Sequence, residues 1–185
     1  MTRLEPIPPA ELDDEQRELY TAITTGPRAR GAATFELVRP DGALRGPFNA
    51  FLLSPRLGDA LQNLGAAIRY RTALPPRVRE MAILTVAAHW DSPFEQSAHE
   101  HVGRACGVTE EEMAAIREGR VPDLADPYER ACAHLARLMV ADGDVDDESW
   151  DSWADQAGNI TVFELSTLVG YYAMIALQMR VFRVH

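Results

Sequence analysis

Apolar residues recur along this chain at intervals of three and four, with polar residues between them. This spacing places the apolar side chains on one face of an α-helix. No segment shows the strict alternation of a half-buried strand, so we predict an all-α fold of about eight or nine helices. The segments expected to be helical are 11–24, 47–53, 55–71, 77–90, 93–106, 109–118, 128–141, 147–156 and 161–181.

Two of these helices have the same start signal, a serine followed by a proline. Ser54 precedes Pro55, and Ser92 precedes Pro93. A serine side chain often accepts a hydrogen bond from the first turn of a helix, and proline is favoured at the first helical position. We therefore predict that Ser54 and Ser92 are N-caps.

Two other helix starts resemble capping boxes, in which a Ser or Thr is followed three residues later by Glu. Thr109 with Glu112 predicts one such start, and Thr161 with Glu164 predicts another for the last helix. Gly107 is expected to end the preceding helix, because glycine readily adopts the left-handed conformation found there.

The segment 25–46 has no helical pattern and is rich in Gly, Pro and Arg. We predict a long loop there. Loops of this length in a compact domain often carry function.

Composition and charge narrow the class of protein. A chain of 185 residues is most simply one domain, 1–185. Its net charge of −10 disfavours a nucleic-acid partner, which would require a basic patch. No apolar run reaches the roughly 18 residues that span a bilayer. The first 16 residues lack the apolar core of a signal peptide, so a cytoplasmic location without membrane association is expected.

The chain contains no lysine, and all 18 of its basic residues are arginine. This excludes a Schiff-base lysine, a pyridoxal phosphate linkage and a Walker-type lysine. No GxGxxG sequence is present either, which disfavours a Rossmann cofactor. We therefore expect no cofactor.

The segment 80–101 combines a helical apolar pattern with candidate acid–base side chains at Glu80, His89, Glu95, His99 and His101. Glu95 and His99 are four residues apart, so they share a helix face. Glu80 lies about ten residues before the turn at position 91, and His99 lies about eight after it. In an antiparallel hairpin both reach similar heights, so a Glu–His–Glu cluster is expected.

Ordinary structural roles are the alternatives for these residues. Glu80 could complement a helix dipole, and Glu95 with His99 could form a surface pair. His89 could be a satisfied core histidine, and His101 is expected to be solvated. Glu95 and His99 supply two metal ligands, but there is no HExxH motif and no strong third ligand, so we expect no metal.

Other nucleophiles lack a recognisable pattern. Cys106 and Cys132 are far apart, and we expect both to be buried thiols without a disulfide. Ser92 and Ser97 lie in no nucleophile elbow, which disfavours a serine hydrolase.

The spacing across the hairpin and the sequence of the last helix resemble the carboxymuconolactone decarboxylase-like family, within the wider AhpD-like fold. The resemblance covers residues 46–184 and implies a helical domain with this core, in which a central helical hairpin carries the site and 1–45 add a helix and a loop. It also implies trimers or hexamers, so we expect a homo-oligomer. The residues that carry it are Glu80, His89, Trp90, Phe94, Glu95, His99 and Glu100.

The redox branch of this fold carries a CxxC motif before the histidine and a glutamate upstream. Aligned on His99, the two cysteine positions are Ser92 and Glu95 here, and Glu80 matches the upstream glutamate. Thiol peroxidase activity requires those thiols, so we expect it to be absent. Many relatives carry an aromatic residue after Glu95 where this chain has Gln96, so pocket shape and substrate are expected to differ.

The resemblance implies a cofactor-independent carboxy-lyase that acts on a small carboxylated lactone or a keto-acid-like compound. Loss of CO2 leaves a carbanion that must be delocalised and protonated. His99 would be the proton donor or electrophile, Glu80 would hold its tautomer and stabilise its cationic form, and Glu95 would act as acid or base.

The remaining candidates would bind the substrate. Arg45 is the candidate clamp for the substrate carboxylate, with Arg71 and Arg79 as alternatives. The other predicted substrate-binding residues are His89, Trp90, Phe94, Phe48 and Tyr171. Two alternative functions stay open: a peroxide-handling AhpD-like protein, and a non-catalytic oligomeric binding protein on the same fold.

Overall fold

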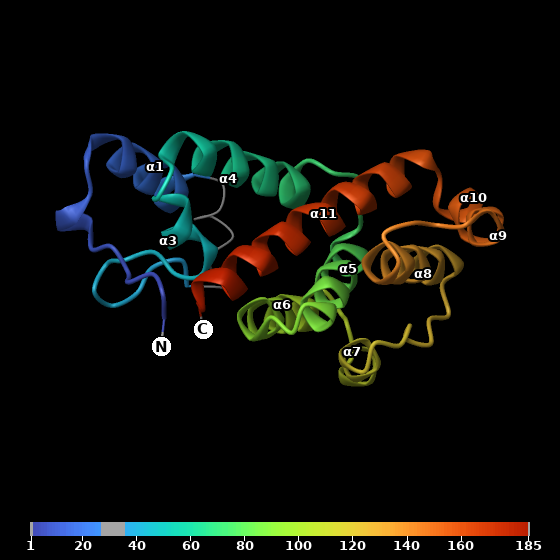
Figure 1. Cartoon of the computed structure of the whole chain (residues 1–185). Coiled ribbons are helices and arrows are strands. Elements are labelled where there is room, and N and C mark those ends of the chain that lie inside the picture. Colours follow the sequence, from blue (N-terminus) through green and yellow to red (C-terminus); the bar gives the residue numbers. More distant parts are fainter. Residues whose placement is uncertain (1, 27–35, 185) are drawn as a thin grey trace. The chain divides into compact units, whose positions relative to one another are not determined.

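The computed structural model describes residues 2–26 and 36–184. Over these residues the regular structure is helical, and the β-bridge between Val38 and Leu44 is isolated, so the all-α prediction is confirmed (Figure 1). The chain divides into two compact units, Met1–Arg71 with Leu177–His185, and Thr72–Ala176. The single domain over 1–185 stays a prediction, and part of the loop predicted over 25–46, residues 27–35, lies outside the described residues.

The first unit contains α1 (Asp14–Thr25), α3 (Pro47–Phe51) and α4 (Pro55–Tyr70), preceded by a 3-10 turn, Pro9–Glu11. Helix α4 packs against both α1 and α3. Its Gly58 permits this approach, because a Cβ there would lie 2.4 Å from the carbonyl oxygen of Phe51 and 2.8 Å from a methyl carbon of Leu19.

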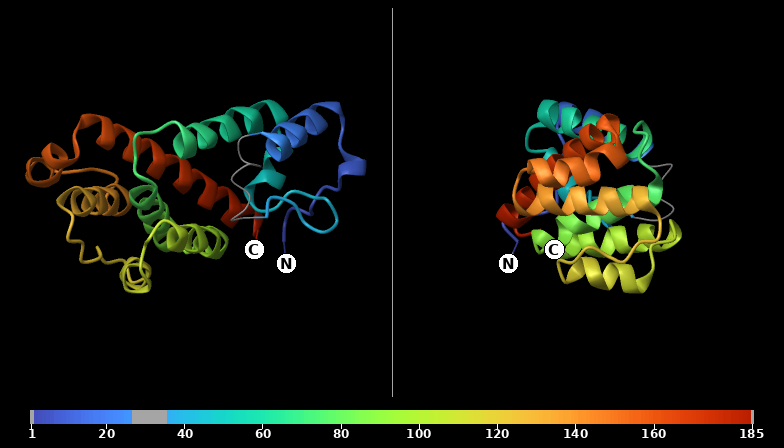
Figure 2. Two further views of the ribbon diagram at one scale, coloured as in Figure 1. Left: turned by 180° about the vertical axis from the view of Figure 1, so that it is seen from behind. Right: turned by 90° about the vertical axis from the view of Figure 1, so that its right-hand side faces the viewer.

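The second unit contains α5 (Pro76–His89), α6 (Pro93–Ala105), α7 (Glu110–Arg117) and α8 (Pro127–Ala141), and most of α11 (Asn159–Phe182). Helix α5 contacts α6, α7 and α8, and Figures 1 and 2 show it between α6 and α8. Because neighbours cover it on several sides, α5 is buried at most of its positions from Val78 to Ala87. Glu80, on this central helix, is fully buried.

The hairpin of α5 and α6 turns at Asp91, which has a φ of 48°, in the left-handed region. Ser92 and Ser54 stand at the N-cap positions as predicted, but neither side chain makes a capping hydrogen bond. Their ψ angles of 89° and 82° differ from the 164° of Thr109, whose side chain does cap. Our prediction of side-chain caps at the two serines is therefore wrong. An N-cap requires extended backbone to aim its oxygen at the first turn.

The capping box of α7 is confirmed, since Thr109 and Glu112 exchange the two expected hydrogen bonds. Gly107 has a φ of 86° and follows the last turn of α6, so its predicted role is also confirmed.

The predicted cap of the last helix is wrong. Helix α11 begins at Asn159, two residues earlier than the prediction allows. The hydroxyl of Thr161 instead lies 3.0 Å from the Tyr128 hydroxyl, and the Glu164 carboxylate accepts hydrogen bonds from the backbone N–H of Ala73. Contacts with other segments therefore replace the local capping box.

The segment predicted as one helix over 147–156 is helical but not uniform. It consists of α9 (Asp147–Ser149), a π-helical turn (Trp150–Ala154) and α10 (Asp155–Ala157). The sequence pattern gives the helical state but not the change in pitch.

Helix α11 is long and apolar enough to cross a membrane, so our statement that no segment reaches that limit is wrong. This is weak evidence for a span, because 44% of its apolar window is buried inside the protein and core helices pass the same test. Leu165, Leu168 and Ile175 are buried, as in a core helix.

Candidate active site

His99 is the centre of a buried acid–base cluster on the α5–α6 hairpin. Its Nδ1 lies 2.6 Å from Oε2 of Glu80 on α5, and the two residues are 6% and 0% exposed. The Nδ1–H therefore donates to the Glu80 carboxylate. A hydrogen bond this short to a charged acceptor is among the strong ones in proteins.

Glu95 approaches the other side of the same imidazole ring. It precedes His99 by one helical turn on α6, and its Oε2 lies 3.3 Å from Nε2 of His99. The Glu95 side chain is 7% exposed. His99 is thus held between two buried carboxylates, each facing a different ring nitrogen.

Arg79 extends the cluster on α5. Its Nε donates to Oε1 of Glu80 at 3.2 Å, and its side chain is 13% exposed. Glu80 therefore accepts from a guanidinium with one oxygen and from His99 with the other. Charges of alternating sign follow one another from Arg79 to Glu95, which compensates for burying Glu80 completely.

Two opposing effects act on the pKa of His99. Burial lowers it, while the hydrogen bond and negative charge of Glu80, helped by those of Glu95, raise it. Together the two carboxylates outweigh the effect of burial, so the pKa of His99 lies above its ordinary value. The geometry agrees, because an imidazolium has two N–H groups and each faces a carboxylate oxygen.

An aromatic side chain closes the cluster from α11. The Tyr172 ring stands edge-to-face on His99, with centroids 5.3 Å apart and planes at 89°. Tyr171, the residue we predicted to line the site, contacts Tyr172 in the same manner at 5.3 Å. Sequence reasoning missed Tyr172 because adjacent residues on a helix differ by about 100° in direction.

Trp90 and Phe94 lie on either side of the hairpin turn, at the end of α5 and in the first turn of α6, and both are half-buried. His89 is exposed and stands edge-to-face with Trp90 at 6.3 Å between centroids. His101 is exposed, as predicted. The substrate-binding roles of Trp90, Phe94 and His89 stay predictions.

Arg45 and Phe48 belong to the first unit, so their predicted places at the site also stay predictions, as does that of Arg71. Arg45 pairs with Glu36 at 3.1 Å, and Phe48 packs edge-to-face on Phe51.

Neither cysteine belongs to the Glu80–His99 cluster. Cys132 is buried in α8, and burial raises the pKa of its thiol to about 11. Cys106 follows the last residue of α6. Within 2–26 and 36–184, no group of three or more His, Cys, Asp or Glu side chains is arranged to hold a metal ion.

The fold and the site define a class: an all-α protein with an acid–base cluster on a helical hairpin. Residues 55–138 match the carboxymuconolactone decarboxylase family. The family resemblance found in the sequence is thereby confirmed. A search of curated proteins gave no match.

Solved structures with the same fold include two kinds of protein. One is a protein of unknown function from Agrobacterium tumefaciens, described as a candidate AhpD antioxidant defence protein, with 15% identity, a TM-score of 0.66, and coverage of 76% of this chain and 97% of that one. Another is the debrominase Bmp8, as a cysteine-to-alanine variant with 2,3,4-tribromopyrrole, with 13% identity, a TM-score of 0.74, and coverage of 100% and 91%. The apo form of Bmp8 has 13% identity and a TM-score of 0.71, with coverage of 97% of this chain and 89% of that one. These similarities establish an AhpD-like fold.

Proposed function

We propose that this protein is a cofactor-independent acid–base enzyme, a carboxy-lyase acting on a small carboxylated lactone or keto-acid-like compound. The observation that carries the proposal is the His99 ring held between the buried carboxylates of Glu80 and Glu95. Buried titratable groups with perturbed pKa values are typical of catalytic sites.

The proposed reaction divides the work among the three side chains. When the substrate carboxylate leaves as CO2, its bonding electrons remain on carbon and are delocalised into a neighbouring carbonyl. His99 then gives its Nε2 proton to that carbon, while Nδ1 keeps its own proton and donates it in a hydrogen bond to the Glu80 carboxylate, which fixes the ring. Glu95, which faces Nε2, returns a proton from solvent. No electrons are exchanged with a cofactor.

The runner-up is peroxide handling by a thiol, which the name given to the Agrobacterium protein suggests. Such chemistry requires an accessible thiolate with a lowered pKa. This chain has Ser92 and Glu95 where the redox branch carries its two cysteines, and the Cys132 thiol pKa is raised to about 11. Both observations favour proton transfer.

The test is CO2 release from carboxymuconolactone and from a panel of β-keto acids. His99→Gln should lower kcat by about 100-fold or more, the range for loss of a general acid. His101→Gln is the matched control, since this exposed histidine lies two residues away on α6, and it should keep full activity.

A second control distinguishes thiol-based peroxide chemistry from the proposed proton transfer. Replacing both Cys106 and Cys132 by serine should leave CO2 release unchanged. Peroxide turnover that disappears in this double variant, without any lyase activity in the wild type, would establish the runner-up instead. Equal activity of wild type and His99→Gln on a turned-over substrate would also refute the proposal.

We further propose a cytoplasmic homo-oligomer, a trimer or hexamer, that binds a small molecule and neither nucleic acid nor membrane. The net charge of −10 supports the lack of a nucleic-acid partner. Large apolar side chains exposed on one chain support self-association: Leu57 at 58%, Ile160 at 71% and Phe163 at 71%. Light scattering coupled to size exclusion tests this, and a monomer at micromolar concentration would contradict it.

A further inference from the structure

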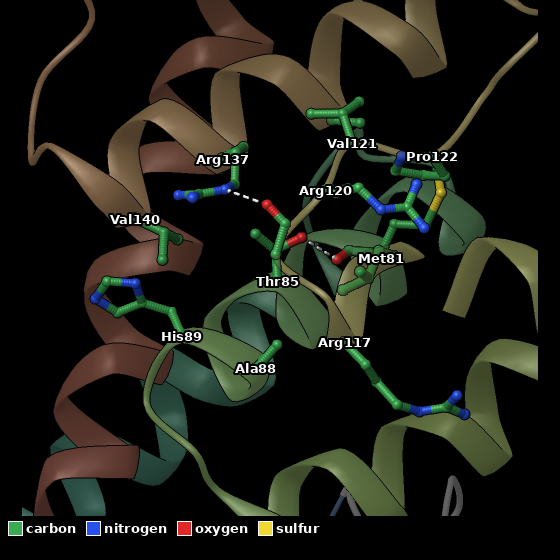
Figure 3. A pocket seen from close by; sticks show the side chains of 13 residues that line it. Met81, Thr85, Ala88, His89, Arg117, Arg120, Val121, Pro122, Arg137 and Val140 are labelled. Atoms are coloured by element: carbon green, nitrogen blue, oxygen red, sulfur yellow. Dashed lines mark hydrogen bonds between the residues drawn. The ribbon is translucent and has the colours of Figure 1, made fainter. Parts of the chain in front are cut away.

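A cavity in the Thr72–Ala176 unit lies on a different face of α5 from the Glu80 cluster. It measures about 70 Å³, and Figure 3 shows its lining. Met81, Thr85 and His89 recur at intervals of four residues, so α5 presents one stripe to the cavity. His89, which we predicted to bind the substrate, lines this cavity.

The charged side chains that line the cavity are all basic. They are Arg117, Arg120 and Arg137, joined by His89, and no carboxylate side chain lines it. This is unusual in a chain with 28 acidic and 18 basic residues. Arg117 pairs with Glu100 at 2.6 Å, and Figure 3 shows its side chain pointing away. Arg120 and Arg137 are the cations available to a ligand.

Arg137 is held in place by one backbone contact. Its Nε donates to the carbonyl of Gly119 at 2.8 Å, and among the described residues this is the sole hydrogen bond of its side chain. The two terminal nitrogens therefore keep their donors. A guanidinium fixed through Nε presents these donors in the geometry that binds a carboxylate bidentately.

Arg120 lines the cavity and directly follows the turn that ends α7. Gly119 has a φ of 73°, and the backbone N–H of Arg120 bonds to the carbonyl of Ala115, as in a Schellman motif. The Arg120 side chain pairs with Glu118, but both are about 60% exposed. An exposed pair of this kind contributes little and is easily exchanged for another anion.

Apart from Thr85, the rest of the lining is apolar. Ala88, Val121, Pro122, Ala133 and Val140 surround a volume suited to a few carbon atoms. A ligand that is complementary to both the arginines and the apolar lining has one negative charge and a short apolar body.

We propose that this cavity binds a small aliphatic carboxylate, with its charge on Arg137 and Arg120 and its apolar end against Val140. The site is separate from the Glu80–His99 cluster and does not depend on the proposed lyase activity. The competing interpretation is that Arg137 merely compensates the C-terminal carbonyls of α7.

The test is isothermal titration of the wild-type protein with butyrate, with butyramide as the uncharged analogue and inorganic phosphate as the second anion. We expect butyrate to bind and butyramide not to bind. Binding of phosphate but not of butyrate would refute the carboxylate assignment. If neither anion binds, the proposal is refuted and Arg137 only compensates the C-terminal carbonyls of α7.

Variants locate the binding. Arg137→Gln should weaken butyrate about tenfold or more, the loss expected for hydrogen bonds to a charged group. Arg130→Gln is the matched control on α8, since Arg130 also donates to a backbone carbonyl, that of Leu124 at 3.0 Å, but does not line the cavity. Butyrate should bind this control as it binds the wild type.

Two further variants keep the result decisive. Arg120→Gln alters an exposed residue, so it should weaken butyrate without affecting folding even if Arg137→Gln unfolds the protein. His99→Ala should retain butyrate binding. Loss of binding in His99→Ala, or undiminished binding in Arg120→Gln together with a folded Arg137→Gln, would refute the site.

Discussion

Replacing Glu80 by glutamine removes the negative charge beside His99 while keeping the size of the side chain. In the wild type the carboxylate accepts the Nδ1 proton at 2.6 Å in a fully buried position, and it raises the pKa of His99. Glutamine can still accept this proton but cannot stabilise the imidazolium. We expect the pKa of His99 to fall below that of the wild type, because burial still acts on it.

The change in pKa predicts how the stability difference depends on pH. A histidine whose folded-state pKa is raised adds stability that is fully present below its unfolded pKa of about 6.5 and is lost as the pH rises through the folded value. Near pH 6, Glu80→Gln should therefore cost about 2–3 kcal/mol, as for a hydrogen bond between charged groups. Above the folded pKa of His99, the cost should fall to about 1 kcal/mol.

Two assays check this prediction. Urea unfolding at several pH values gives the free-energy difference, and NMR titration of the imidazole gives the pKa of His99, assigned by its loss in His99→Gln. Glu111→Gln, at an exposed carboxylate on α7, should change the stability by less than about 0.5 kcal/mol at any pH. A cost for Glu80→Gln that does not vary with pH, together with an unchanged His99 pKa, would refute the reasoning.

Two further predictions concern the scaffold of the hairpin. Arg77 on α5 pairs with Glu112 on α7 and Glu129 on α8, at 2.5 and 3.0 Å, and its side chain is 22% exposed. Arg77→Met should cost about 2 kcal/mol in urea unfolding, because two partly buried carboxylates lose their shared cation; a cost below about 0.5 kcal/mol would contradict this. Thr109→Ala, which removes the capping box of α7, should cost about 1 kcal/mol by the same assay, whereas Thr109→Ser should be nearly neutral.

The helical fold and the central pairing could be predicted because they depend on spacing. Apolar periodicity defined the helices, and the short connection at Asp91 implied an antiparallel hairpin with Glu80 and His99 at matching heights. Glu95 followed from its separation of four residues from His99. These relations depend on helix geometry alone.

Features that depend on tertiary contacts could not be predicted in the same way. Thr161 has the sequence of a cap, but its hydroxyl lies beside Tyr128 instead. The rotation of α11 about its axis decides that the Tyr172 ring stands edge-to-face on His99. Likewise, Arg79 donates to Glu80, whereas the sequence suggested it only as an alternative clamp for the substrate carboxylate.

The central claim is that His99 protonates the carbon from which CO2 departs, and decarboxylation in D2O tests it most directly. Mass spectrometry of the product should find one deuterium at that carbon, formed at a rate that falls about 100-fold or more in His99→Gln and not in His101→Gln. Product without deuterium at that carbon, or labelled product formed by His99→Gln at the wild-type rate, would contradict the account.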